Sequence, residues 1–177
     1  NPPVVTPTGS FTIPISTAFV LTGVANDPDV GDMLTYTWEQ IDDGIVTQSS
    51  FGPTNPVGAN FRSVKPSANN ERYFPQLSKV VAGNLTQTNP SVNSNWETVS
   101  DVEPELNFAL TVRDNAMGGG QVVSDLVNVF VDNSAGPFTV TSQTTNVVVP
   151  AGESEVIAWD VANTDKAPIN AQTVDIM

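Results

Sequence analysis

Three aspartates lie within six residues near the start of the chain, in the stretch 26–40, which reads NDPDVGDMLTYTWEQ. Asp27, Asp29 and Asp32 are separated by Pro28 and Gly31, two residues that favour a tight turn. Carboxylates this close repel one another unless a positive charge lies among them, and a turn can direct several oxygens at one point. Because calcium prefers oxygen ligands, the spacing predicts a calcium site in this turn.

A second acidic turn, DNAMGGG at 114–120, is expected to reach the same site. The predicted ligands are Asp27, Asp29, Asp32, Asp114 and Asn115, with Asn26 as the alternative amide and backbone carbonyls completing the 6 to 8 oxygens that calcium takes. A second interpretation stays open, in which these residues are turn formers whose side chains cap nearby backbone amides. Calcium is the one cofactor that the sequence suggests.

The elements that position these turns read as short strands. Leu34, Tyr36 and Trp38 alternate with polar residues at the period of two typical of a strand with one face on a core, so Trp38 is expected to be a central core residue. The other expected strands lie at 10–14, 17–24, 96–99, 106–113 and 121–132, the last two forming a hairpin. The pattern predicts an all-β, immunoglobulin-like β-sandwich over residues 1–133.

Regular periodicity fails from about 47 to 95, where five prolines are scattered among Asn, Ser and Gly. So long a stretch is expected to be an insertion, with one short helix within 73–81 that packs it against the body. Its basic residues form either a cationic patch or salt links to an acidic surface. Likewise, its aromatic residues either pack the insertion or form a ligand surface, whose residues would be Trp96, Tyr73, Arg62 and Arg72.

Composition excludes several classes of function. The net charge of −13 argues against nucleic acid and anionic membranes as partners, and the absence of Cys excludes disulfides and thiolate metal sites. With neither His nor Cys, the usual nucleophile and base pairs are missing, so no catalysis is expected. Carboxylates for a glycosidase exist in sequence, but they are expected to form a solvated loop face: Glu97, Asp101, Glu103 and Glu105.

After a linker signal at 133–137, NSAGP, the strand pattern restarts. Strands are expected at 138–142, 146–149, 155–161 and 173–177, with Trp159 as the buried aromatic. About 40 residues are too few to close a two-sheet core, so residues 134–177 should be the first strands of a second, incomplete sandwich. Other residues of a longer protein, or a neighbouring molecule, would complete it.

Three phrases together resemble the PKD-like and cadherin-like group of immunoglobulin-fold modules: NPPVV at 1–5, DPDVGDMLTYTW at 27–38 and LTVRDNAMGGGQVVSDLVNVFV at 110–131. This resemblance covers 1–133 apart from the insertion, and it implies a turn that either binds calcium or is purely structural. Longer phrases resemble the region after the catalytic domain of secreted bacterial reprolysin-type zinc metalloproteases: FRSVKPSANNERYFPQLSKVVAGN at 61–84, LNFALTVRDNAMGGG at 106–120 and GPFTVTSQTTNVVVPAGESEVIAWDVANTDKAPINAQTVDI at 136–176.

The second resemblance implies a non-catalytic accessory or spacer module of a secreted or cell-surface bacterial protein. Its partners would be neighbouring domains of the same chain and a protein or polysaccharide substrate. The protease itself is not represented, because a chain without His has no HExxH zinc site. The alternative function is a carbohydrate- or adhesin-type binding module that uses the long insertion as its ligand surface.

Overall fold

The computed structural model describes residues 1–174 of the chain, and almost all of their regular secondary structure is strand. The elements in chain order are β1 (Val4–Thr6), β2 (Phe11–Pro14), β3 (Phe19–Thr22), β4 (Val24–Asn26), β5 (Thr35–Gln40), β6 (Glu71–Phe74), α1 (Leu77–Val81), β7 (Glu105–Arg113), β8 (Val122–Asp132), β9 (Thr139–Val140) and β10 (Trp159–Asp160). The expected all-β class is therefore confirmed.

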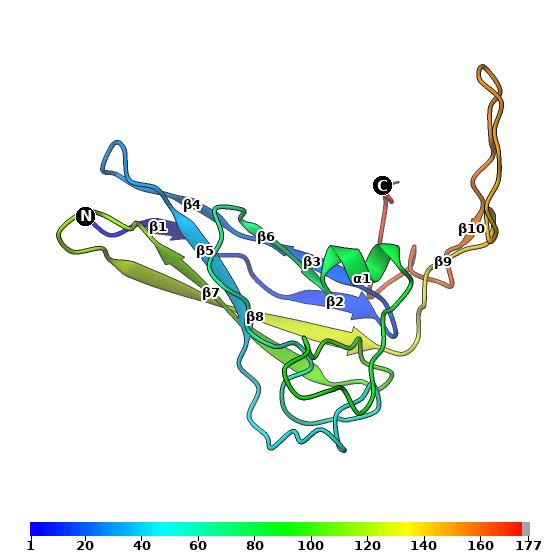
Figure 1. Cartoon of the computed structure of the whole chain (residues 1–177), viewed down its shortest axis with the longest axis horizontal. Coiled ribbons are helices and arrows are strands. Elements are labelled where there is room, and N and C mark those ends of the chain that lie inside the picture. Colours follow the sequence, from blue (N-terminus) through cyan, green and yellow to red (C-terminus); the bar gives the residue numbers. More distant parts are fainter. Residues whose placement is uncertain (175–177) are drawn as a thin grey trace.

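One layer of the fold is a four-stranded sheet in the order β2-β8-β7-β5. Strands β7 and β8 form the predicted hairpin, in register from the pair Glu105 and Phe130 to the pair Arg113 and Val122. Strand β5 adds to β7 in antiparallel orientation, whereas β2 runs parallel to β8. The long β7 and β8 strands form the centre of this layer in Figure 1.

A second layer consists of two antiparallel pairs, β1 with β4 and β3 with β6, which lie along one side of the sheet in Figure 1. The core between the layers includes Leu21 of β3, Trp38 of β5 and Leu110 of β7, and Leu34 and Tyr36 pack against it. Trp38 is only 2% exposed. The alternation seen in the sequence therefore has the predicted orientation, and the fold is a β-sandwich.

Gly23 lies between β3 and β4 and allows this core to close. A Cβ atom at this position would lie 2.7 Å from the Cδ2 atom of Leu110, a side chain with no exposed surface. The backbone of Gly23 exchanges hydrogen bonds with Asn70, which lies just before β6. The missing side chain thus lets β7 pack closely under the second layer.

The insertion contributes to the sandwich more than its sequence indicates. Strand β6 lies inside the range 47–95 and pairs with β3, and Phe61 joins the core cluster at 2% exposed. The rings of Phe61 and Phe74 meet edge to face, with centroids 5.1 Å apart. The predicted helix exists as α1, but none of its residues is buried. The expectation that this helix packs the insertion down is therefore wrong, because Phe61 and β6 do so.

Residues 134–174 form much less regular structure than predicted. Strands β9 and β10 pair over two residues each, and 146–149 contain no strand. In Figure 1 the chain between β9 and β10 extends away from the body as a long arm. Trp159 is 40% exposed, so its assignment as the buried aromatic of a second core is wrong. The strand expected at 173–177 falls partly outside the described residues.

Candidate metal centre

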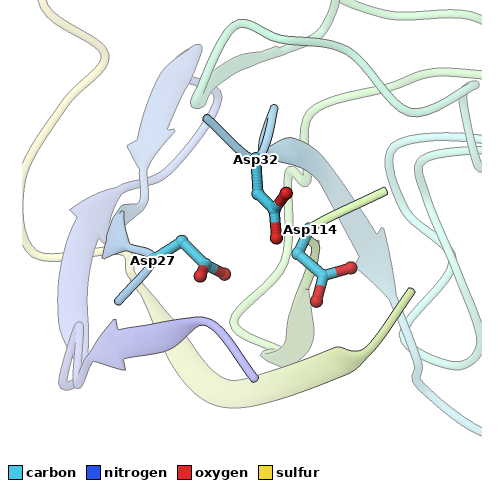
Figure 2. A group of neighbouring side chains, drawn as sticks. All are labelled: Asp27, Asp32 and Asp114. Carbon is cyan, nitrogen blue, oxygen red and sulfur yellow. The ribbon is translucent and has the colours of Figure 1, made fainter. Parts of the chain in front are cut away.

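Three carboxylates from separate parts of the chain meet at one end of the sandwich. Asp27 follows β4, Asp32 lies in the turn before β5, and Asp114 follows β7. One oxygen of each lies within 4.8 Å of one oxygen of each of the others. Figure 2 shows the three carboxyl groups gathered between the turn that precedes β5 and the end of β7. The two acidic turns recognised in the sequence are therefore neighbours in space.

The turns fix two of these carboxylates through backbone hydrogen bonds. Oδ1 of Asp27 accepts a hydrogen bond of 2.8 Å from the N–H of Asp29, which closes the turn. Oδ1 of Asp114 accepts hydrogen bonds from the N–H groups of Ala116, at 3.1 Å, and Gln121, at 2.8 Å. The turn-forming interpretation of the sequence thus accounts for one oxygen on each of these two side chains.

The remaining oxygens are not accounted for in this way. Oδ2 of Asp27 is buried and has no hydrogen-bond partner among residues 1–174. The carboxylate of Asp32 accepts no hydrogen bond within the same residues, and the Asp114 side chain is 1% exposed. A buried carboxylate oxygen without a donor is costly unless a cation replaces the lost water.

Repulsion among the three carboxylates also favours a cation at this position. Two unit charges 4.8 Å apart repel by about 1 kcal/mol in water and by about 3 to 4 kcal/mol at the effective dielectric of a protein surface. Three such pairs act against the folded state unless they are neutralised. The donor set is entirely carboxylate oxygen, which suits calcium or magnesium and not a soft transition metal.

Two of the predicted ligands lie beside the cluster with their side chains engaged elsewhere. The Asp29 carboxylate pairs with the terminal amino group of Asn1, and the side-chain amide of Asn1 donates to it at 2.7 Å. The hydrogen bond from the terminal ammonium lowers the pKa of Asp29. The side-chain nitrogen of Asn115 donates to the Met33 carbonyl at 2.6 Å, which ties the two acidic turns together.

Of the four residues predicted to form a ligand surface, three are exposed or half-buried and one is buried. Arg62 is exposed, and its guanidinium carbon lies 5.4 Å from the ring centroid of the half-buried Trp96. Tyr73 lies on β6, opposite Val20, and is half-buried. Arg72 is 8% exposed and points into the protein, so it cannot belong to a surface. Its place in the alternation of β6, one residue from Tyr73, puts it on the inner face.

Arg72 belongs to a buried polar centre that sequence reasoning missed. Its guanidinium donates to the Trp38 carbonyl at 2.5 Å and to the Arg62 carbonyl at 2.6 Å, and it lies 3.4 Å from Oε1 of Glu97. Burial lowers the pKa of Arg72, and the charge of Glu97 opposes this shift. Lys79 approaches the other oxygen of Glu97 at 3.5 Å. Two of the four basic residues of the insertion therefore make salt links.

The carboxylates considered for glycosidase chemistry each contact different partners within the protein. Glu97 has no exposed surface and pairs with two cations, and Asp101 accepts a hydrogen bond from the hydroxyl of Ser16 at 2.6 Å. Glu105 accepts a hydrogen bond from Asn128. The expectation that Glu97 lies on a solvated loop face is therefore wrong, whereas Asp101, Glu103 and Glu105 are exposed.

Comparison with known proteins adds no assignment. No family model matches the chain, and no curated protein has a sequence similar to it. Within residues 1–174, no helix has the length and apolar character needed to cross a membrane.

Proposed function

We propose that this chain is a non-catalytic accessory or spacer module, stabilised by calcium, in a secreted multidomain bacterial protein of the zinc metalloprotease kind. The observation that carries the proposal is the meeting of Asp27, Asp32 and Asp114, three carboxylates from two turns far apart in sequence. A spacer needs a rigid end, and an ion shared by two turns supplies rigidity without chemistry.

The chemical fit of the cluster favours calcium. The three carboxylates offer oxygens of the kind that calcium binds, and backbone carbonyls and water would complete its coordination. A cation would stabilise Oδ2 of Asp27 in particular, because this oxygen is buried and has no hydrogen-bond partner among the described residues. Magnesium is a weaker fit, since it retains several waters and demands a near-ideal octahedron.

The role of the ion would be to fasten the turn before β5 to the turn between β7 and β8. The amide of Asn115 already joins these turns through the Met33 carbonyl. Calcium would add attraction where the bare carboxylates repel, so the folded state would bind it and the unfolded chain would not. Mass action then makes stability depend on calcium concentration.

The proposal predicts that calcium raises the melting temperature. At ten times the dissociation constant, binding stabilises a protein by about 1.4 kcal/mol, which is about 3–5 °C for a domain of this size. The test compares thermal unfolding in calcium and in chelator for the parent chain and for Asp32→Asn. Asp32 is chosen because its carboxylate accepts no hydrogen bond from residues 1–174.

A matched control for this test is Asp43→Asn, which removes one exposed carboxylate outside the cluster. The parent and Asp43→Asn should gain the full shift in calcium, while Asp32→Asn should gain little. Equal melting temperatures in calcium and chelator for the parent chain would refute calcium stabilisation. An equal shift in Asp32→Asn would place the ion elsewhere.

A further inference from the structure

A hollow of about 210 Å³ opens between the first half of the insertion and the segment that follows the insertion. Five of its six lining residues have apolar side chains, and two of these, Phe51 and Phe61, are less than 5% exposed. The hollow is lined by Val46, Phe51, Ala59, Phe61, Arg62 and Trp96. It lies apart from the acidic cluster and shares no residue with it.

Arg62 is the one charged side chain that lines the hollow. The residue is exposed, and its guanidinium lies over the Trp96 ring at 5.4 Å from the ring centroid. Its hydrogen bond to the Ser94 carbonyl is long, at 3.4 Å, and no carboxylate pairs with it within residues 1–174. In a chain with net charge −13, a cation without an acidic partner is available to an external anion.

The walls on both sides of the hollow are held in place. Backbone bonds join the two segments, from the N–H of Arg62 to the carbonyl of Trp96 at 3.0 Å and from the N–H of Thr98 to the carbonyl of Asn60 at 3.1 Å. The indole N–H of Trp96 donates to the Ser91 carbonyl at 3.0 Å. Little ordering is therefore required when a ligand enters, which favours binding.

We propose that this hollow binds a small organic carboxylate with an apolar or aromatic body. The body occupies the space between Phe51, Phe61 and Trp96, and the carboxylate pairs with the guanidinium of Arg62. A cationic ligand would meet the like charge of Arg62.

Size narrows the ligand further. Sites for drug-sized ligands commonly reach about 300–1,000 Å³, and the hollow is smaller than that range. One ring or one amino-acid side chain fits this space better than an extended polymer. Two kinds of ligand carry a carboxylate on an apolar body: a free organic acid, and a peptide whose C-terminal residue has an apolar side chain.

The test uses phenylacetate and N-acetyl-L-phenylalanine as probes, with N-acetyl-L-phenylalanine amide as the uncharged match. Binding is followed by the shift of the Trp96 indole N–H in NMR spectra, assigned with Trp96→Phe. We expect saturable, millimolar binding of both acids and binding of the amide that is weaker by about fivefold, the size of one exposed ion pair. Whichever acid binds more tightly identifies the source.

Two variants test whether binding of the acids depends on the positive charge of Arg62 or only on the net charge of the chain. Arg62→Gln should weaken binding of the acids to the level of the amide, whereas Lys65→Gln, which removes an exposed cation outside the lining, should leave it unchanged. Equal binding of acid and amide, tighter binding of glucuronate than of phenylacetate, or no saturable shift would overturn the proposal. Because the measurements are made in chelator and in calcium, the result is independent of the calcium proposal.

Discussion

Glu97 and Arg72 form an ion pair in the interior of the protein, with Oε1 of Glu97 3.4 Å from a guanidinium nitrogen and both side chains less than 10% exposed. The pair joins β6, which lies inside the insertion, to the segment that follows the insertion. Backbone groups complete the arrangement, since the carbonyls of Trp38 and Arg62 accept from the guanidinium and the N–H of Gln76 donates to Oε2 of Glu97. The insertion is thus fastened by a polar centre as well as by an apolar one.

Replacing Glu97 with Gln should be strongly destabilising. The change keeps the side-chain shape but leaves the charge of Arg72 buried without compensation, a loss of about 3–5 kcal/mol for a broken buried pair. The free energy of unfolding from urea titration measures the effect. Glu105→Gln, at an exposed carboxylate, serves as the control and should change stability by less than about 0.5 kcal/mol. Similar stability of the two variants would contradict the structural role given to Glu97.

Phe61 should be the residue that anchors the first half of the insertion. Phe61→Ala removes a ring that is 2% exposed and contacts Phe74, so a loss of about 3–5 kcal/mol is expected. Limited proteolysis should then cut within 41–60 sooner than in the parent. Val57→Ala, at an exposed position, should leave both measurements unchanged. An unaltered cleavage pattern in Phe61→Ala would show that the anchor lies elsewhere.

Gly23 and Leu110 should be coupled energetically. Gly23→Ala places a Cβ atom 2.7 Å from the Leu110 side chain and should cost about 1–3 kcal/mol through overpacking. Leu110→Ala should cost about 2–5 kcal/mol through its cavity. In the double variant the new methyl group enters that cavity, so the combined loss should be smaller than the sum. Additive losses, measured by denaturant titration, would rule out the contact.

The regular part of the fold could be predicted because its signal is local. The alternation at Leu34, Tyr36 and Trp38 and the hairpin of β7 and β8 follow directly from a period of two. Strand β6 could not be found in this way, because its inward residues are Arg72 and Phe74, and a buried arginine breaks the apolar pattern. Glu97, the ion-pair partner of Arg72, lies 25 residues away in the sequence, so no local pattern indicates that the two side chains meet.

The acidic cluster was predictable in part for a related reason. Aspartates in two turns at the same end of a sandwich must lie near each other once the hairpin of β7 and β8 is recognised. Which side chains face inward depends on the detailed turn: the Asp27 carboxylate bonds to the N–H of Asp29, and Asn115 has a φ of +55°. Periodicity carries no information on such orientations, so the predicted ligand set was larger than the group that meets.

The most direct test of the central claim is a calorimetric titration of the chelator-treated chain with calcium. One calcium ion should bind per chain, and binding should be lost in Asp114→Asn, whose amide oxygen can still accept the N–H groups of Ala116 and Gln121. Melting curves in chelator would verify that the variant remains folded. Absence of calcium binding by the parent chain, or undiminished binding by folded Asp114→Asn, would contradict the assignment of this cluster as the site that stabilises the module.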